Sequence, residues 1–236
     1  MTYKPTDFMR CLLILSLIIF LSPARAAEED VKINCRFLCL ENASPPPLLC
    51  VSASGAEVTC KVPNGAISGE SVCFVVENAI TFLAPTDRKT AAVAKIPANL
   101  KRAILIFVAG SKNPGALPWQ VFVIEDTTKN MPDGGAFLVN FHNQDIRCIV
   151  GEAKIQLRPG MSSGVGQPAK RDDFNMAPVA IQFQLADKWR DASETMLRFL
   201  PGMRYLIFAY LDPESRRPKV RTVEDTKINA PVPTKP

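Results

Sequence analysis

Histidine is nearly absent from this sequence, which has one, His142, among its 236 residues. A catalytic nucleophile–base pair would need His142 beside Cys148 or a serine such as Ser162, and a histidine at the solvent-facing end of a strand is the simpler interpretation. The sequence also lacks a GxSxG elbow, a phosphate-binding loop and an HExxH motif. We therefore expect a protein that is not an enzyme and has no catalytic residue, cofactor or metal.

Long runs of one charge are missing too. The formal net charge is +5, but the basic residues are scattered among acids and form only pairs such as Lys170–Arg171 and Arg216–Arg217. Nucleic-acid binding needs a basic stripe with interleaved aromatic residues, so we expect no nucleic-acid partner. The acidic pairs Glu125–Asp126 and Glu224–Asp225 cannot form catalytic dyads, because neighbours on a strand point to opposite faces. We interpret them as the polar ends of strands.

One apolar run, Cys11–Leu21, stands out near the N-terminus, and Lys4 and Arg10 precede it. Ala24 and Ala26 follow at the small-residue positions that a signal peptidase recognises, so we expect cleavage after Ala26 and a periplasmic or secreted protein. An uncleaved anchor is the alternative, but the run is short of the ~20 residues that a membrane span needs. No later run is long enough, so we expect no transmembrane segment after cleavage.

The rest of the chain has the two-residue periodicity of strands. Alternation is clear in Val31–Phe37, Glu57–Val62 and Ala180–Leu185, and the 20 prolines leave little room for long helices. Asp187–Phe199 is the one segment with passable helical spacing, and Ser162–Gln167 is expected to be a flexible loop. Many short strands with regular turn signals predict an all-β fold of the sandwich type.

The two halves of the chain also resemble each other, since five segments recur in the same order at offsets of 98 to 101 residues. Chance reuse of strand-forming residues is the alternative explanation. We predict two tandem immunoglobulin-like β-sandwich repeats of about seven strands, at residues 27–128 and 129–227, with a Pro-rich disordered tail at 228–236. The matched segments are Arg36–Leu38 with Ala136–Leu138, Leu48–Cys50 with Ile146–Cys148, Pro63–Gly65 with Pro159–Gly160, Arg102–Phe107 with Arg204–Phe208, and Val123–Thr127 with Thr222–Thr226.

Phe137–Asn140, followed by a polar turn and then Leu157–Gly160, resembles the opening strands of uncharacterised secreted β-sandwich modules of Gram-negative bacteria. The resemblance covers most of residues 135–225 in pattern and implies an exported sandwich without an assigned activity. Periplasmic pilus chaperones are similar in architecture alone, because they pair two immunoglobulin-like domains at a similar length.

Six cysteines remain after the expected cleavage, and five of them lie in the first repeat. Cys50 and Cys60 flank the turn at Gly55 and are a candidate disulfide across a hairpin. Cys39 aligns with Val139 and Cys60 with Leu157, so both are also expected to be buried thiols in apolar positions. The cysteine cluster has no CxxC or Cys/His spacing and does not predict a metal site.

Trp119 and Trp189 are candidate ligand-facing aromatics, with Tyr205 and Tyr210 as further members of a sugar-stacking platform. Aromatic lids on the sandwich core are the alternative. The leading prediction for function is a non-catalytic envelope or secreted protein, structural or protein-binding, whose partner is an unknown protein or cell-envelope component. The alternatives are a carbohydrate- or ligand-binding module and a pilus-chaperone-like periplasmic protein that uses an open strand edge.

Ala103–Ala109 is apolar at seven successive positions, and Tyr205–Leu211 is nearly so. A strand with one face in water alternates, whereas a strand covered on both faces need not. We therefore predict that both segments are central strands whose second face lies at or near the contact between the two repeats. Cover of that face by long loops or by a partner protein is the alternative.

Overall fold

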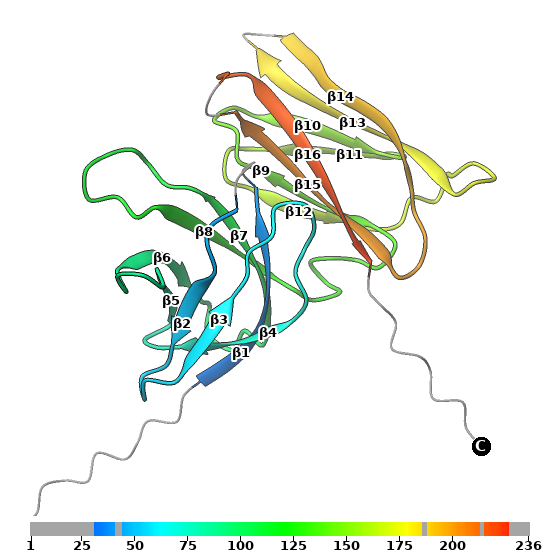
Figure 1. Ribbon diagram of the computed structural model, residues 1–236. Helices are drawn as coiled ribbons and strands as arrows, with labels where there is room; N and C mark the ends of the chain where they lie inside the picture. The colour runs from blue at the N-terminus through cyan, green and yellow to red at the C-terminus, as the bar shows by residue number, and fades with distance from the viewer. Residues whose placement is uncertain (1–30, 41–43, 186–187, 213–214, 227–236) are drawn as a thin grey trace, which may run out of the picture.

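The computed structural model describes residues 31–40, 44–185, 188–212 and 215–226, and these form an all-β protein of 16 strands without a helix (Figure 1). The first half holds β1 (Val31–Cys39), β2 (Leu48–Val51), β3 (Glu57–Cys60), β4 (Ser71–Val75), β5 (Ala79–Leu83), β6 (Thr90–Lys95), β7 (Arg102–Ala109) and β8 (Trp119–Glu125). The second half holds β9 (Ala136–Asn140), β10 (Ile146–Val150), β11 (Ala153–Leu157), β12 (Ser162–Val165), β13 (Met176–Leu185), β14 (Lys188–Arg198), β15 (Met203–Leu211) and β16 (Pro218–Thr226).

The strands pair into four sheets of four, two in each half. The first half contains β4-β1-β7-β8 and β3-β2-β5-β6, and the second contains β12-β9-β15-β16 and β11-β10-β13-β14. Adding eight to each strand number of the first half gives the strand order of the second. Both halves also share a parallel pair, β1 with β7 and β9 with β15, among otherwise antiparallel ladders. Figure 1 shows the halves as two bodies, β1–β8 at lower left and β9–β16 at upper right.

Each half has its own hydrophobic core, to which both of its sheets contribute. Phe37, Phe82 and Phe107 meet edge to face in the first core, with ring centroids 5.3–6.3 Å apart. The second core is built around Phe183 and Phe199. Short strands such as β10 alternate between buried and half-buried positions, as expected when one sheet face is covered.

A third hydrophobic cluster joins the halves, and we call the region where they meet the junction. It forms because β7 and β15 are inner strands that are buried on both faces. Leu105 points into the first core, whereas Ile106 points into the junction. This arrangement confirms the prediction made from the unbroken apolar runs. The first half contributes Leu38, Leu40, Ile104, Ile106 and Ile124, and the second contributes Phe137, Val139, Leu206, Phe208 and Val223.

The strand register corrects part of the sequence alignment between the halves. Phe37 lies in the first core, but its matched residue Phe137 lies in the junction. The cause is a one-residue slip, which moves a side chain to the opposite face of a strand. Cys35 pairs with Ala103, and Ala136 pairs with Tyr205. With Arg102 matched to Arg204, the counterparts of Phe37 and Cys39 are therefore Leu138 and Asn140.

Two local predictions differ from the structure, and one ambiguous segment is resolved by it. Residues 188–198, whose spacing did not decide between helix and strand, form the strand β14, which pairs with β13 along its whole length. Ser162–Val165 is the strand β12 rather than a loop, and it pairs with β9. Each half has eight strands instead of about seven.

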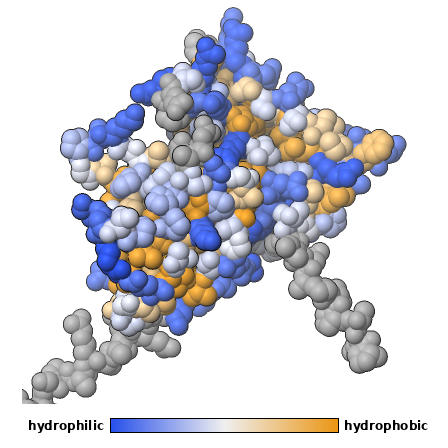
Figure 2. Space-filling model, viewed as in Figure 1, coloured by the Kyte–Doolittle hydropathy of each residue, from blue (hydrophilic) through white to orange (hydrophobic). Residues whose placement is uncertain are grey.

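The predicted leader, residues 1–26, and the predicted tail, residues 228–236, lie outside the described residues. No helix of the length and apolarity needed to cross a membrane occurs in the part of the chain that the structure describes. Figure 2 shows hydrophobic residues in patches on the surface among hydrophilic ones. Val31 and Val72, on the neighbouring strands β1 and β4, and Phe122 on β8 are among the exposed large hydrophobic residues.

Candidate functional site: the junction between the two halves

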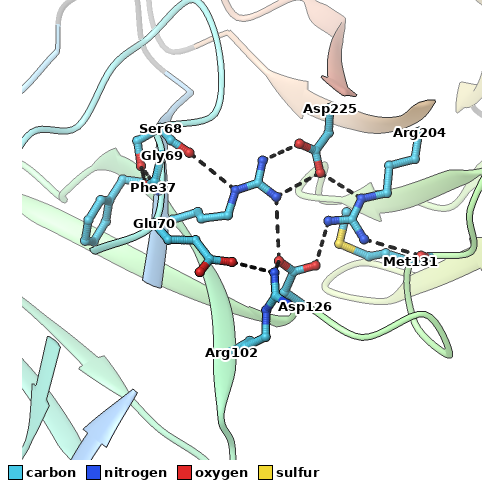
Figure 3. Close-up of polar contacts among 10 residues, drawn as sticks. Phe37, Ser68, Gly69, Glu70, Arg102, Asp126, Met131, Arg204 and Asp225 are labelled. Atoms are coloured by element: carbon cyan, nitrogen blue, oxygen red, sulfur yellow. Dashed lines mark hydrogen bonds and ion pairs between the residues drawn. The ribbon is translucent and has the colours of Figure 1, made fainter. Parts of the chain in front are cut away.

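A cluster of arginines and aspartates lies at one end of the junction (Figure 3). Arg204, at the start of β15, is 1% exposed. Its guanidinium donates to Asp225 Oδ2 at 2.7 Å and to Asp126 Oδ1 at 2.6 Å, and it also reaches the Met131 carbonyl at 3.4 Å. Because Asp126 and Asp225 occupy corresponding positions in the two halves, this one side chain links them.

Arg36 of β1 completes the cluster from the first half. It forms a bidentate pair with Asp225, donates to the Ser68 carbonyl at 3.3 Å and lies 3.6 Å from Asp126 Oδ2. Arg102 lies 3.6 Å from the same Asp126 oxygen, which accepts no hydrogen bond. The charges of two buried carboxylates are thus matched by two largely buried arginines, with Arg102 at the edge of the cluster.

The environment of Asp225 has opposing effects on its pKa. Burial raises it, but the hydrogen bond and charge of Arg36, together with those of Arg204, outweigh burial and lower the pKa below its ordinary value. The pKa of Arg36 shifts upward: burial lowers it, but the hydrogen bonds to Asp225 and the charges of Asp225 and Asp126 outweigh that effect. Both acidic pairs lie at strand ends, as predicted, since β8 ends at Glu125 and β16 ends at Thr226. Asp126 and Asp225 are nevertheless buried in the junction, which the prediction did not include.

A groove of about 560 Å³ opens beside the apolar part of the junction, and we call it the junction groove. Its floor includes the junction side chains Ile124, Phe137 and Val139, and one wall holds Phe122, whose ring lies 4.2 Å from that of Phe141. The remaining lining residues are Pro97–Leu100, Val123, Glu125, Asn130, Gly160 and Ser162–Gly164.

The junction groove lies between two strands at the edges of their sheets, β8 and β12. Hydrogen bonds from Asp126 N to Arg102 O and from Gly110 N to Pro118 O fix the phase of the β7–β8 ladder. By the alternation of an antiparallel pair, the backbone groups of Val121 and Val123 then point away from β7. These backbone groups lie along the outer edge of the sheet, where β8 is the last strand.

The same argument applies to β12 on the other side of the groove. Asn140 N donates to Met161 O, so the backbone groups of Ser162 and Gly164 point away from β9. A Cβ atom on Gly164 would lie 2.3 Å from the Asn130 carbonyl, so only glycine allows the segment before β9 to pass so close. Two strand edges without a ladder partner among the described strands thus flank a groove whose lining mixes apolar and polar residues.

The structure does not bring the predicted aromatic platform together. Trp119 opens β8 and Trp189 lies in β14, so they belong to different sheets in different halves. Trp119 is half-buried against the first core, and the Trp189 ring is covered by the guanidinium of Arg147 at 4.3 Å. Tyr205 is buried in the second core, which removes it from any surface platform.

The structure describes six cysteines, all of them buried and none joined to another in a disulfide. Cys39 and Cys60 are fully buried, as predicted. The register pairs Leu48 with Cys60 and Ile146 with Leu157, which confirms the match of Cys60 with Leu157. Cys50 and Cys60, the candidate disulfide, lie on the neighbouring strands β2 and β3, offset diagonally by two residues.

His142 is buried rather than turned to solvent, so that interpretation is wrong. Its ring packs edge to face on Phe183, with centroids 4.7 Å apart, and its Nδ1 accepts a hydrogen bond from Gln144 N at 3.1 Å. Burial lowers the pKa of His142. Asn140 holds this turn, because it accepts from His142 N and donates to the carbonyls of Gln144 and Leu157.

Sequence reasoning missed the junction cluster and the groove. The signal for the cluster was present, since Arg102 and Arg204 recur with Asp126 and Asp225. No model of a known protein family matches the chain, and no curated protein matches it in sequence. Within the described residues, no three or more His, Cys, Asp or Glu side chains are placed to hold a metal ion.

Proposed function

We propose that the protein is an exported, non-catalytic binding module that holds an extended segment of another polypeptide in the junction groove. The observation that carries the proposal is the pair of edge strands, β8 and β12, on either side of a groove that mixes apolar and polar residues. An extended segment can add to such an edge through main-chain hydrogen bonds, while its alternate side chains enter the groove.

The burial of the reactive side chains supports a binding role over catalysis. His142 and the cysteines lie in the cores, and the two buried carboxylates, Asp126 and Asp225, are held by arginines. A binding surface made of backbone edges needs none of these groups.

Export and the sandwich class are part of the proposal. The leader at residues 1–26 would deliver the chain to the periplasm or outside the cell, where its partner is an envelope component or another exported protein. Each half would be a domain of the broad immunoglobulin-like class, which shares an architecture rather than one strand order. The order β4-β1-β7-β8 facing β3-β2-β5-β6 differs from the four-on-three arrangement of an antibody constant domain.

Selection of displayed random peptides on the exported protein, followed by fluorescence anisotropy, tests the proposal. Val123→Pro removes an outward N–H at the groove without breaking the β7–β8 ladder, and it should weaken a selected peptide roughly tenfold, by about 1.4 kcal/mol. Thr222→Pro is the matched control, because it makes the same change at an outward position of the edge strand β16, away from the groove. Equal weakening by both variants, or selection of no peptide, would count against the proposal.

A carbohydrate- or ligand-binding role remains a second candidate because of Trp119. This residue lines a cavity of about 560 Å³ between β6 and β8, which shares Pro97, Phe122 and Val123 with the junction groove. Glycan-array binding that is lost in Trp119→Ala and kept in Trp189→Ala would support it.

A further inference from the structure

Four buried thiols meet in the core of the first half. Cys35 and Cys73 come from β1 and β4 of one sheet, and Cys50 and Cys60 come from β2 and β3 of the other. None of the four is exposed, and all four belong to the same hydrophobic core.

The strand register disfavours a disulfide between two cysteines of the same sheet. Cys73 pairs with Ile33, so Cys35 is its diagonal neighbour, and Cys50 and Cys60 are related in the same way. Diagonal positions in an antiparallel pair are ~7–8 Å apart. A disulfide joins Cα atoms that are about 4.4–6.8 Å apart.

Cys50 and Cys73 are placed differently, because they face each other from opposite sheets. Cys50 Sγ accepts a hydrogen bond from Phe74 N at 3.3 Å and lies 3.8 Å from Phe74 O. The Cys50 sulfur thus rests against the backbone at the residue that follows Cys73. We propose that Cys50 and Cys73 form a disulfide that joins the two sheets of the first half.

The oxidant is a disulfide, either of an oxidoreductase or of oxidised glutathione. The thiolate of one of the two cysteines attacks one of its sulfurs and displaces the other as a thiolate, and the second cysteine then attacks the sulfur of the first in the mixed disulfide. Two electrons and two protons pass from the cysteines to the oxidant, which ends as two thiols. Because both sulfurs are fully buried in the folded chain, this exchange occurs before the first core closes.

Digestion after glutamate under non-reducing conditions identifies the bond. Cleavage after Glu41, Glu57, Glu70 and Glu77 places Cys50, Cys60 and Cys73 on three separate peptides. In the exported protein, alkylated during lysis, peptide 42–57 should be linked to peptide 71–77. Cys50→Ala should abolish the link and Cys39→Ala should keep it. Reduction should lower the thermal midpoint by roughly 5–15 °C in the parent and leave that of Cys50→Ala unchanged.

The inference rests on the proposed export, so the full chain is also refolded in vitro with oxidised glutathione. Suppose that the Cys50–Cys73 link is found in the refolded protein but not in protein taken from cells. That result would support the disulfide and count against export to an oxidising compartment. A bond from Cys50 to Cys60, free thiols in both preparations, or bound zinc held by the four thiolates would overturn the disulfide itself.

Discussion

At the scale of single residues, the junction depends on one arginine. Arg204 is buried between two carboxylates that come from different halves of the chain, and it satisfies an oxygen of each. Neither Asp126 nor Asp225 has a comparable partner that is as fully buried, since Arg36 and Arg102 are more exposed. Burying charges is costly, so the cluster holds the halves together only while every charge is matched.

Arg204→Ala should therefore lower the free energy of unfolding by about 3–5 kcal/mol, because it leaves two carboxylates without their buried partner. Urea denaturation followed by circular dichroism measures the change. Arg88→Ala is the matched control, since Arg88 pairs with Glu57 on the surface and its loss should leave the midpoint unchanged. Equal effects of the two substitutions would show that the buried cluster does not stabilise the fold.

Acid should weaken the same cluster. The pKa of Asp225 is lower in the folded protein than its unfolded value of about 3.9, so its stabilising contribution is complete above that pH. The contribution is lost as the pH falls below about 4 toward the folded pKa. Urea midpoints measured from pH 6 to pH 3 should fall steeply below pH 4 in the parent protein. The fall should be shallower in Asp225→Asn, which starts from a lower midpoint.

His142 should act in a different pH range. Burial lowers its pKa below the unfolded value of about 6.5, so the folded state favours the neutral ring. Its contribution is present above pH 6.5 and is lost as the pH falls from there toward the folded pKa. His142→Gln should flatten the midpoint curve just below pH 6.5 and leave the fall below pH 4 in place. If His142→Gln leaves the dependence of the midpoint on pH unchanged, protonation of the His142 ring does not destabilise the folded state, and this prediction is wrong.

At the scale of strands, the amino-acid pattern predicts the fold class and the central position of β7 and β15. It fails where the side-chain period cannot decide. Residues 188–198 have an ambiguous period, and pairing with β13 settles them as a strand. Phe37 and Phe137 were matched by sequence, but they face different hydrophobic clusters. Sequence similarity between two strands does not show which face of each strand is covered.

The candidate site was harder to predict than the fold. The groove arises from two strand edges, β8 and β12, that are brought together only by packing of the halves. The ion cluster joins side chains 78 and 189 residues apart in sequence. The recurrence of Arg102 as Arg204 marks where the arginines of the cluster lie in the sequence. It does not reveal that Arg204 of the second half binds Asp126 of the first.

Neighbouring positions on β7 should respond differently to a buried charge. Leu105→Asp puts a carboxylate into the first core and should unfold the first half. Ile106→Asp puts it into the junction and should separate the halves while both cores remain folded. Limited proteolysis between β8 and β9, at residues 126–135, should be faster in Ile106→Asp, with two protected fragments. Ile106→Val is the control, and loss of all protected fragments in both aspartate variants would contradict the separate roles.

At the scale of the whole molecule, the halves are two bodies with separate cores and a shared boundary. Eight strands pair within each half, and no ladder between described strands crosses from one half to the other. Cooperation between the halves must then come from side chains, among them the apolar junction, the Arg204 cluster and Arg221, which donates to the carbonyls of Cys39 and Leu40. A junction that is both apolar and ion-paired allows little movement of one half along the other, because such a shift would leave buried charges without their partners.

The two tryptophans allow this cooperation to be measured, because Trp119 reports on the first half and Trp189 on the second. Two single-tryptophan proteins, Trp189→Phe and Trp119→Phe, should unfold in urea at the same midpoint, since the junction makes the loss of one half destabilise the other. Adding Ile106→Asp to each should separate the two midpoints, while Ile106→Val should keep them together. If the two single-tryptophan proteins with Ile106 intact already unfold at different midpoints, the halves unfold independently. The junction groove would then form only when the two halves come together on binding a partner.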